Sequence, residues 1–274
     1  MNSLERKMVD QLIDLKENHH AIGIKAEFEA EGTRLEEALR LKEVITKAGL
    51  DLTIKIGGCE ALKDMYDSRS IGVTRIVGPM IETAYALKKF LACANLAFPE
   101  EERKEVDFLI NVETISTVKN FDSMLKLPNI AELKGVVVGR VDMTGSMDLT
   151  RNDINSDAIG EICNEILTKA KNFNKDMECV IGGGVSADSL PFFDKHTHGR
   201  LDKFETRKVL FDAHHVTLAK GGDKGILKAV GFELMWLKNK RNFYGMIYKE
   251  DENRIHMLQQ RYDKLIAEAG GKYE

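Results

Sequence analysis

Short apolar runs alternate along the chain with segments whose apolar residues recur at helical spacing. Six runs are short and mostly β-branched, near residues 22, 53, 74, 108, 136 and 179, and a more charged seventh lies near 205. Amphipathic segments between them include 33–49, 82–96 and 157–173. Runs that are apolar throughout are typical of strands buried on both faces, so the alternation predicts a parallel sheet flanked by helices.

The predicted fold is an α/β protein of the TIM (β/α)8 barrel class. The 274 residues match one such barrel, whose usual size is roughly 250 residues. A doubly wound sheet is the alternative, but no GxGxxG follows the first strand. We expect a helix at 1–20, one barrel domain at 21–215 with its eighth strand near 210–217, and a helical extension at 216–274.

Two of the apolar runs each end in an acid. Phe108–Val112 is followed by Glu113, and Gly135–Val141 is followed by Asp142. Because the C-terminal ends of parallel strands meet at the active-site face of such folds, the two carboxylates are expected side by side. Paired carboxylates suit a hard cation, so we predict a Mg²⁺ or Mn²⁺ site. Two helix-capping acids are the alternative interpretation.

Further charged residues are expected at the same face. Glu27, Glu29 and Glu31 alternate at the end of the first strand, where mutual repulsion would raise a pKa and create an acid or base. A solvated strand end would explain them equally well. Lys55 ends the second strand and could bind a substrate carboxylate or phosphate, form a Schiff base, or pair with Glu27 or Glu29.

The late part of the barrel offers substrate-binding candidates. Gly182 and Gly183 begin a glycine turn whose backbone N–H groups could hold an anion, although a plain tight turn is also possible. Glu205 and Arg207 alternate with Lys203 along the seventh run. Since barrel interiors are normally aliphatic, we expect Glu205 and Arg207 to serve a site, with a solvated strand as the alternative.

Composition excludes several classes of function. The formal net charge is −4, and no basic stripe suggests a nucleic-acid partner. No apolar run approaches 18 residues, the N-terminus is charged, and the four cysteines form no CxxC pair. We therefore expect a cytoplasmic protein without a membrane partner. Apolar residues between Trp236 and Tyr262 predict a helix that docks a neighbouring subunit, hence a homo-oligomer.

Three segments resemble the HpcH/HpaI aldolase and citrate lyase β-subunit family. They are PMIETAYAL at 79–87, INVETISTVKNFDSML at 110–125 and GVVVGRVDMTGSM at 135–147. The resemblance implies a TIM barrel that makes or breaks carbon–carbon bonds beside an enolate, with a divalent metal on Glu113 and Asp142. In this chain Arg140 replaces the family proline, Ala30 stands at the position of the general-base histidine, and Lys55 replaces a substrate-binding arginine.

The function expected from the resemblance is a metal-dependent carbon–carbon lyase acting on a small acidic substrate, such as a 2-oxo acid. Lys55 and Arg140 would neutralise the substrate's carboxylate or phosphate, and Glu27 or Glu29, or a water held by them, would replace the histidine base. One alternative is an enzyme on the same barrel that takes a larger phosphorylated or nucleotide-linked acid. Another is a non-catalytic binding protein that kept the barrel and lost the base.

Overall fold

A computed structural model describes residues 1–217 and 221–271. Its strands are β1 Ala21–Glu27, β2 Asp51–Lys55, β3 Arg75–Gly78, β4 Asp107–Val112, β5 Gly135–Gly139, β6 Glu178–Gly182, β7 Lys203–Glu205 and β8 Val209–Asp212. Its helices are α1 Ser3–His19, α2 Leu35–Lys47, α3 Leu62–Ile71, α4 Ala84–Ala97, α5 Glu100–Arg103, α6 Ile115–Met124, α7 Arg140–Ser146, α8 Asp157–Phe173, α9 Ser189–His196 and α10 Gly222–Glu268. Two 3-10 turns lie at Ile130–Glu132 and Arg151–Asp153.

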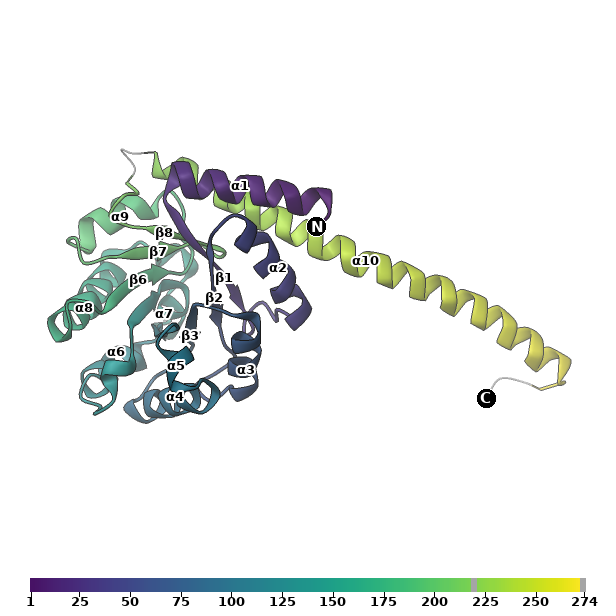
Figure 1. Cartoon of the computed structure of the whole chain (residues 1–274), viewed down its shortest axis with the longest axis horizontal. Helices are drawn as coiled ribbons and strands as arrows, with labels where there is room; N and C mark the ends of the chain where they lie inside the picture. The colour runs from purple at the N-terminus through teal and green to yellow at the C-terminus, as the bar shows by residue number, and fades with distance from the viewer. Residues whose placement is uncertain (218–220, 272–274) are drawn as a thin grey trace. The chain divides into compact units, whose positions relative to one another are not determined.

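The strands form one closed barrel, in which each strand pairs with its neighbours in sequence and β8 closes onto β1. Helices follow most strands and surround the barrel, as Figure 1 shows. This confirms the predicted eight-stranded barrel. The run at 135–141 proved shorter as a strand than expected, because the chain turns as soon as it leaves the barrel: β5 ends at Gly139 and helix α7 begins directly at Arg140.

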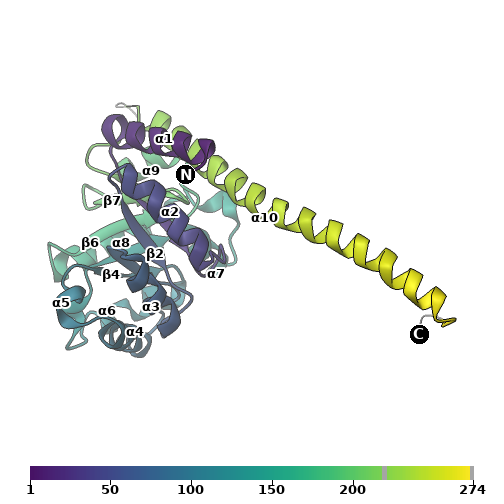
Figure 2. The ribbon, with the colours of Figure 1, turned by 45° about the vertical axis from the view of Figure 1, so that its right-hand side comes forward.

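The chain divides into two compact units, Met1–Glu233 and Leu234–Glu274. The first holds the barrel, α1 and the first three turns of α10. Helix α1 buries Met8, Leu12 and Leu15, and the start of α10 buries Ala229 and Phe232. The second unit consists mainly of the rest of α10, which is one uninterrupted helix in Figure 2. Across residues 1–217 and 221–271, no helix is both long and apolar enough to span a membrane.

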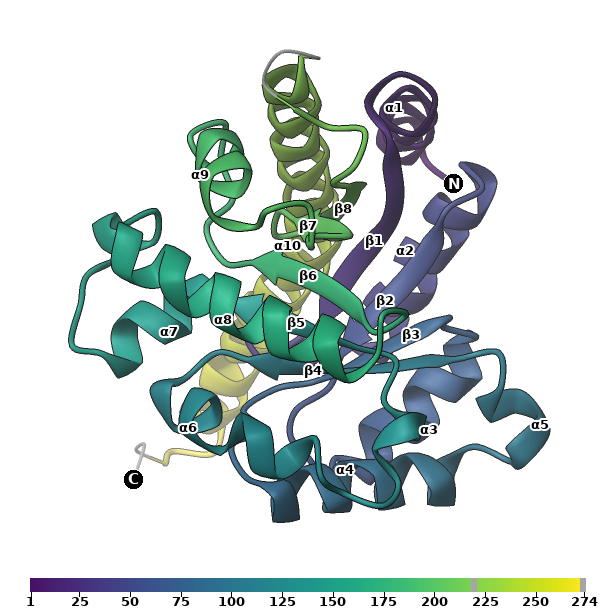
Figure 3. The same cartoon turned by 90° about the vertical axis from the view of Figure 1, so that its left-hand side faces the viewer.

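The last strand departs from the parallel pattern. Strands β1 to β7 are parallel to one another, but β8 is antiparallel to both β7 and β1. Only residues 206–208 separate β7 from β8, and a connection this short suits a hairpin, whereas a parallel crossover needs a dozen residues or more. Figure 3 shows the two strands side by side beyond β6. The hairpin turn therefore lies with the C-terminal ends of β1 to β7, which we call the mouth of the barrel.

The barrel interior has an aliphatic side and a charged side. Val77, Leu109, Val137 and Val180, from four successive strands, form a buried cluster. On the other side, β1, β2 and β7 send charged side chains inward, and these are also buried: Lys25, Glu27, Lys55 and Glu205. Charge inside a barrel requires partners, because desolvating an unpaired ion costs several kcal/mol. The charged side chains are therefore expected to pair with one another near the mouth of the barrel.

Candidate active site

A cleft at the mouth of the barrel brings together most of the residues that the sequence singled out. The candidates among its lining residues are Glu27, Lys55, Glu113, Asp142, Gly182, Gly183, Glu205 and Arg207. It is also lined by charged or polar residues that sequence reasoning did not select, namely Lys25, Asn111, Arg151, Thr206 and Glu233. Two candidates, Glu29 and Arg140, are not part of its lining.

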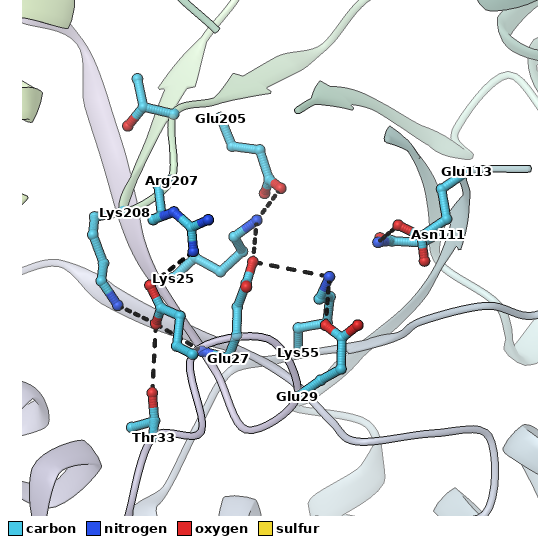
Figure 4. A network of polar contacts seen from close by, with 12 residues as sticks. Lys25, Glu27, Glu29, Thr33, Lys55, Asn111, Glu113, Glu205, Arg207 and Lys208 are labelled. Carbon is cyan, nitrogen blue, oxygen red and sulfur yellow. Dashed lines mark hydrogen bonds and ion pairs between the residues drawn. The ribbon is translucent and has the colours of Figure 1, made fainter. Parts of the chain in front are cut away.

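Lys25 is the centre of an ionic network inside the barrel (Figure 4). Its ammonium group donates to the Glu205 carboxylate and lies 3.1 Å from Oε1 of Glu27. Lys25 is 7% exposed, Glu27 6% and Glu205 5%, so all three charges are desolvated. Burial alone lowers the pKa of Lys25, but Glu205 and Glu27 outweigh burial and raise it, which favours the charged form of the lysine.

Repulsion between the acids at the end of β1 was predicted to raise a pKa, but the structure gives each of them a nearby cation. Burial pushes the pKa of Glu27 up, but the charges of Lys25 and then Lys55 lower it below its usual value. Strand β1 ends at Glu27, so the expected alternation stops and Glu29 and Glu31 point to different partners. The prediction that crowding would raise a pKa here was wrong for Glu27, because the charges of two nearby lysines outweigh the effect of burial.

Lys55 bridges two acids at the mouth. Its Nζ lies 2.8 Å from Glu29 and 4.0 Å from Glu27. Burial lowers the pKa of Lys55, but Glu27, Glu29 and Glu113 together raise it. A lysine held in the charged form is a poor Schiff-base nucleophile, which must be neutral, and a good partner for an anion.

The β7–β8 hairpin adds a second group of charges at the rim. Lys208 is buried and donates to Glu31, while Arg207 is about half exposed. The Arg207 guanidinium lies 3.8 Å from Glu31 and 3.8 Å from Glu233 of α10. Burial raises the pKa of Glu233, and the opposing effects of Arg207 and Lys208 do not cancel this. Glu233 is thus a cleft-lining carboxyl group that holds its proton more strongly than an ordinary glutamate.

Glu113 follows β4 directly and is 1% exposed. One carboxylate oxygen accepts from the Met80 backbone N–H at 2.9 Å, and the other accepts from the Asn111 side chain at 2.7 Å. Burial raises the pKa of Glu113 and the negative charge of Asp142 adds to the rise, against the lowering effects of Lys55, Met80 and Asn111. Its buried carboxylate is therefore oriented, and no lysine or arginine among the described residues forms an ion pair with it.

Asp142 lies in the first turn of α7, rather than at the tip of β5 as expected. Its side chain is exposed and lines the cleft with Glu113. Within residues 1–217 and 221–271, no group of three or more His, Cys, Asp or Glu side chains converges as a metal site. Mg²⁺ is commonly bound through one or two carboxylates, with water and substrate completing the shell. The donor set and the under-compensated charge of Glu113 fit an open site of that kind.

Arg140 lies outside the cleft because α7 starts at this residue and turns its side chain into the protein. The guanidinium is fully buried and donates to the carbonyls of Gly182 and Gly183 and to Ser189. It also packs over the rings of Phe192 and Phe193, at 5.0 and 5.3 Å from their centroids. Burial lowers the pKa of Arg140 to about 10. The structure therefore places this residue as a clamp on the glycine turn, outside the lining of the cleft, and does not support its predicted contact with a substrate carboxylate.

Glycines make room for the carboxylates. A Cβ on Gly139 would lie 2.9 Å from the Cβ of Glu113, and one on Gly182 would lie 2.8 Å from Oε1 of Glu205. Gly183 has φ +78, and a Cβ there would meet the backbone nitrogen of Arg140 at 2.7 Å. Gly182 and Gly183 line the cleft as predicted. Because they have no side chain, they also leave space for the Glu205 carboxylate and for the Arg140 backbone.

Replacing Lys25 by Met tests the network. We expect K25M to lower the free energy of unfolding by about 3–5 kcal/mol at pH 8, because Glu205 and Glu27 keep buried charge without their main partner. In the wild type the lowered pKa of Glu27 stabilises the fold above its unfolded-state pKa of about 4.3, and this is lost as pH falls through the folded value. In K25M burial dominates and raises that pKa, so stability falls as pH rises, and the defect is larger at pH 8 than at pH 5.

Urea unfolding at the two pH values measures this difference. Lys63→Met, which removes an exposed lysine paired with Asp67, is the matched control and should leave stability unchanged. Adding Glu205→Gln to K25M should recover part of the loss. An equal defect at pH 5 and pH 8 would contradict the assignment of the loss to buried, unpaired carboxylates.

Comparisons with known proteins agree with the geometry. The HpcH/HpaI aldolase/citrate lyase family profile matches residues 20–182. The solved structure of citrate synthase SbnG is similar with a TM-score of 0.58 and 11% identity, covering 93% of this chain and 90% of that one. An HpcH/HpaI aldolase/citrate lyase family protein from Burkholderia cenocepacia gives a TM-score of 0.55 at 13% identity, with coverage of 87% and 100%. No curated protein matches the chain. At these identities the structures support the fold, while the profile spans more than half of the sequence, and the chain therefore belongs to the HpcH/HpaI aldolase/citrate lyase family.

Proposed function

We propose that this protein is a divalent-metal-dependent carbon–carbon lyase that acts on a 2-oxo acid or a related acidic substrate. Family membership supports an enzyme of the aldolase or citrate lyase type. The observation that carries the finer proposal is that Glu113, directly after β4, and Asp142, in the first turn of the helix after β5, line one cleft. Lys25, Lys55 and Arg207 line the same cleft, so an anionic substrate would meet cations there as well.

Glu113 and Asp142 would hold the Mg²⁺ or Mn²⁺ ion. When bound, such an ion supplies Lewis-acid stabilisation of the negative charge on an enolate oxygen. The residues of the chain do the rest. Lys55 is kept charged by three acids and would bind the substrate carboxylate. The Met80 N–H and the Asn111 amide hold Glu113 in one orientation, which preorganises this part of the cleft.

Proton transfer requires a group whose pKa lies near the working pH. Glu27 fits this role poorly, because two lysines hold it in the charged form. Glu29 does not line the cleft, and Lys55 binds it at 2.8 Å. Glu233 lines the cleft and has a raised pKa. We therefore assign general acid–base work to Glu233, in place of the residues chosen from the sequence.

A second candidate is a substrate that extends toward the rim and carries a phosphate. Arg151 is exposed and lines the cleft, and Arg207 is about half exposed there. Two arginines at one opening suit a dianion. Lys203, which alternates with Arg207 in the sequence, does not line the cleft. Its ammonium group pairs instead with Glu178 of β6 at 2.6 Å.

Metal binding can be measured without an assay of turnover. Addition of Mn²⁺ or Mg²⁺ to protein treated with EDTA should raise the melting temperature, since a ligand at about 100 times its Kd stabilises a fold by about 2.7 kcal/mol. Glu113→Gln and Asp142→Asn should each abolish the rise. Asp148→Asn removes another exposed acid just after α7 and should retain it. An equal rise in all four proteins would contradict the assignment of the ligands.

Activity is tested with pyruvate and a series of aldehydes, in both directions of the aldol reaction. We expect turnover with Mg²⁺ or Mn²⁺, none with EDTA, and a fall in kcat of about 100-fold or more for Asp142→Asn, because charge stabilisation by a metal is worth several kcal/mol. Turnover that is unaffected by EDTA would refute the metal-dependent mechanism. Inactivity with 2-oxo acids, together with melting shifts caused by phosphorylated acids, would favour the second candidate. Turnover excludes a non-catalytic binding protein.

Substitution of Glu233 by Gln should lower kcat by about 100-fold, the usual size of a general acid–base contribution. The pH profile distinguishes this role from a structural one. The limb of the kcat profile that depends on a raised carboxyl pKa should vanish in E233Q, whereas the melting shift with Mn²⁺ should persist. An unchanged pH profile at lower kcat would show that Glu233 only supports Arg207.

A further inference from the structure

Helix α10 carries an exposed apolar seam over the part that belongs to the second unit. Leu234, Leu237, Tyr248, Ile255 and Leu258 are each 51–66% exposed. Arg241, Tyr244 and Asp251 complete the series. The eight positions are separated by alternating steps of three and four residues: 234, 237, 241, 244, 248, 251, 255 and 258. Such spacing over more than three heptads is that of the a and d positions of a coiled coil, which bury their side chains against another helix.

Two members of the seam are charged. Arg241 and Asp251 are both exposed. Among the residues that the structure describes, the Arg241 guanidinium binds only the side chain of its neighbour Asn242, and Asp251 forms no ion pair. A charge at a core position of a coiled coil is costly unless an opposite charge meets it, and such positions fix register and orientation.

We propose that this face binds the same helix of a second copy of the chain as an antiparallel coiled coil centred on Met246. In that register residues whose numbers are symmetric about 246 lie opposite each other. Arg241 then faces Asp251 of the second copy, and the two-fold axis repeats the pair. The other layers are wholly apolar or aromatic, and they pair Leu234 with Leu258, Leu237 with Ile255, and Tyr244 with Tyr248.

The flanking positions support the same register. Lys238 lies beside Glu252 of the second copy, Ile247 beside its own equivalent, and Gly245 meets Gly245 at the centre, where two backbones can approach closely. One pair is unfavourable, Lys240 beside Arg254. However, Arg254 is held by Glu250 of its own helix at 2.6 Å, which reduces the repulsion.

The seam discriminates against the parallel arrangement. In a parallel, in-register pair each residue meets its own equivalent, so that Arg241 would face arginine and Asp251 would face aspartate. Both layers would then bury like charges, which costs several kcal/mol at an interface. An unrelated partner would not require the symmetry of the sequence about Met246. Self-complementarity therefore identifies the occupant as a second copy of this chain.

Charge exchange tests the pairing in the full-length protein. Light scattering should give the wild type at least twice the 30.8 kDa of one chain. Arg241→Asp should raise the dissociation constant of this interface about 100-fold, about tenfold for each of two lost pairs. Adding Asp251→Arg to it should restore association. Lys249→Asp, an exposed change off the seam, should have no effect. A monomeric wild type, or association unchanged by Arg241→Asp, would overturn the proposal.

Crosslinking tests the orientation. Of the four cysteines only Cys59 is not buried, so Cys59→Ser gives a suitable background. A mixture of Leu237→Cys and Ile255→Cys proteins should form disulfide-linked dimers on mild oxidation, and neither variant should do so alone. Dimers formed by each variant alone, but not favoured in the mixture, would indicate a parallel pair and overturn the antiparallel register. Melting curves of both variants show whether the fold is retained.

Discussion

The ion pairs of Lys25 with Glu27 and Glu205 are the constraint on which the mouth of this barrel depends. Lys25 and Glu205 come from β1 and β7, which are separated in the sheet only by the four-residue strand β8. Their contact crosses that short strand inside the barrel. A buried ion pair adds little net stability, because desolvation offsets the attraction, yet losing one partner is expensive. The network therefore matters more for holding β1 and β7 in position on either side of β8 than for the net stability of the barrel.

Because of this network, the two sides of the cleft differ in how far their charges are compensated. On the side of β1, β2 and β7, acids and lysines neutralise one another, and Glu27 and Lys55 keep their charges. On the side of β4 and β5, Glu113 and Asp142 have no lysine or arginine bound to them among the described residues, and the pKa of Glu113 is raised. An added cation would thus be drawn to Glu113 and Asp142, whereas Lys55, which stays charged, is the cation that an anionic substrate would meet on the other side. The proposed lyase uses both properties.

The sequence predicted the barrel and the two acids because both depend on local pattern. Apolar runs marked the strands, and an acid directly after a run marked the mouth. The sequence missed Lys25, since a single lysine inside an apolar strand has no signal, and its partner Glu205 lies 180 positions away. Arg140 was misjudged for another reason. Sequence did not show that a helix begins at that residue, which turns the guanidinium away from the cleft.

The antiparallel direction of β8 has a consequence for how such an enzyme could change its specificity. The chain leaves β8 at the end of the barrel opposite the mouth, where the Asp212 N–H binds the His20 carbonyl at 3.1 Å. Helix α10 then runs back toward the mouth and presents Val230 and Glu233 to the cleft from its first few turns. This part of the cleft wall is formed by a helix instead of a loop, so an inserted residue would rotate the side chains that follow it away from the cleft. Variation there is confined to exchanging one side chain at a time, which favours gradual changes in substrate size over the gain of a new lid.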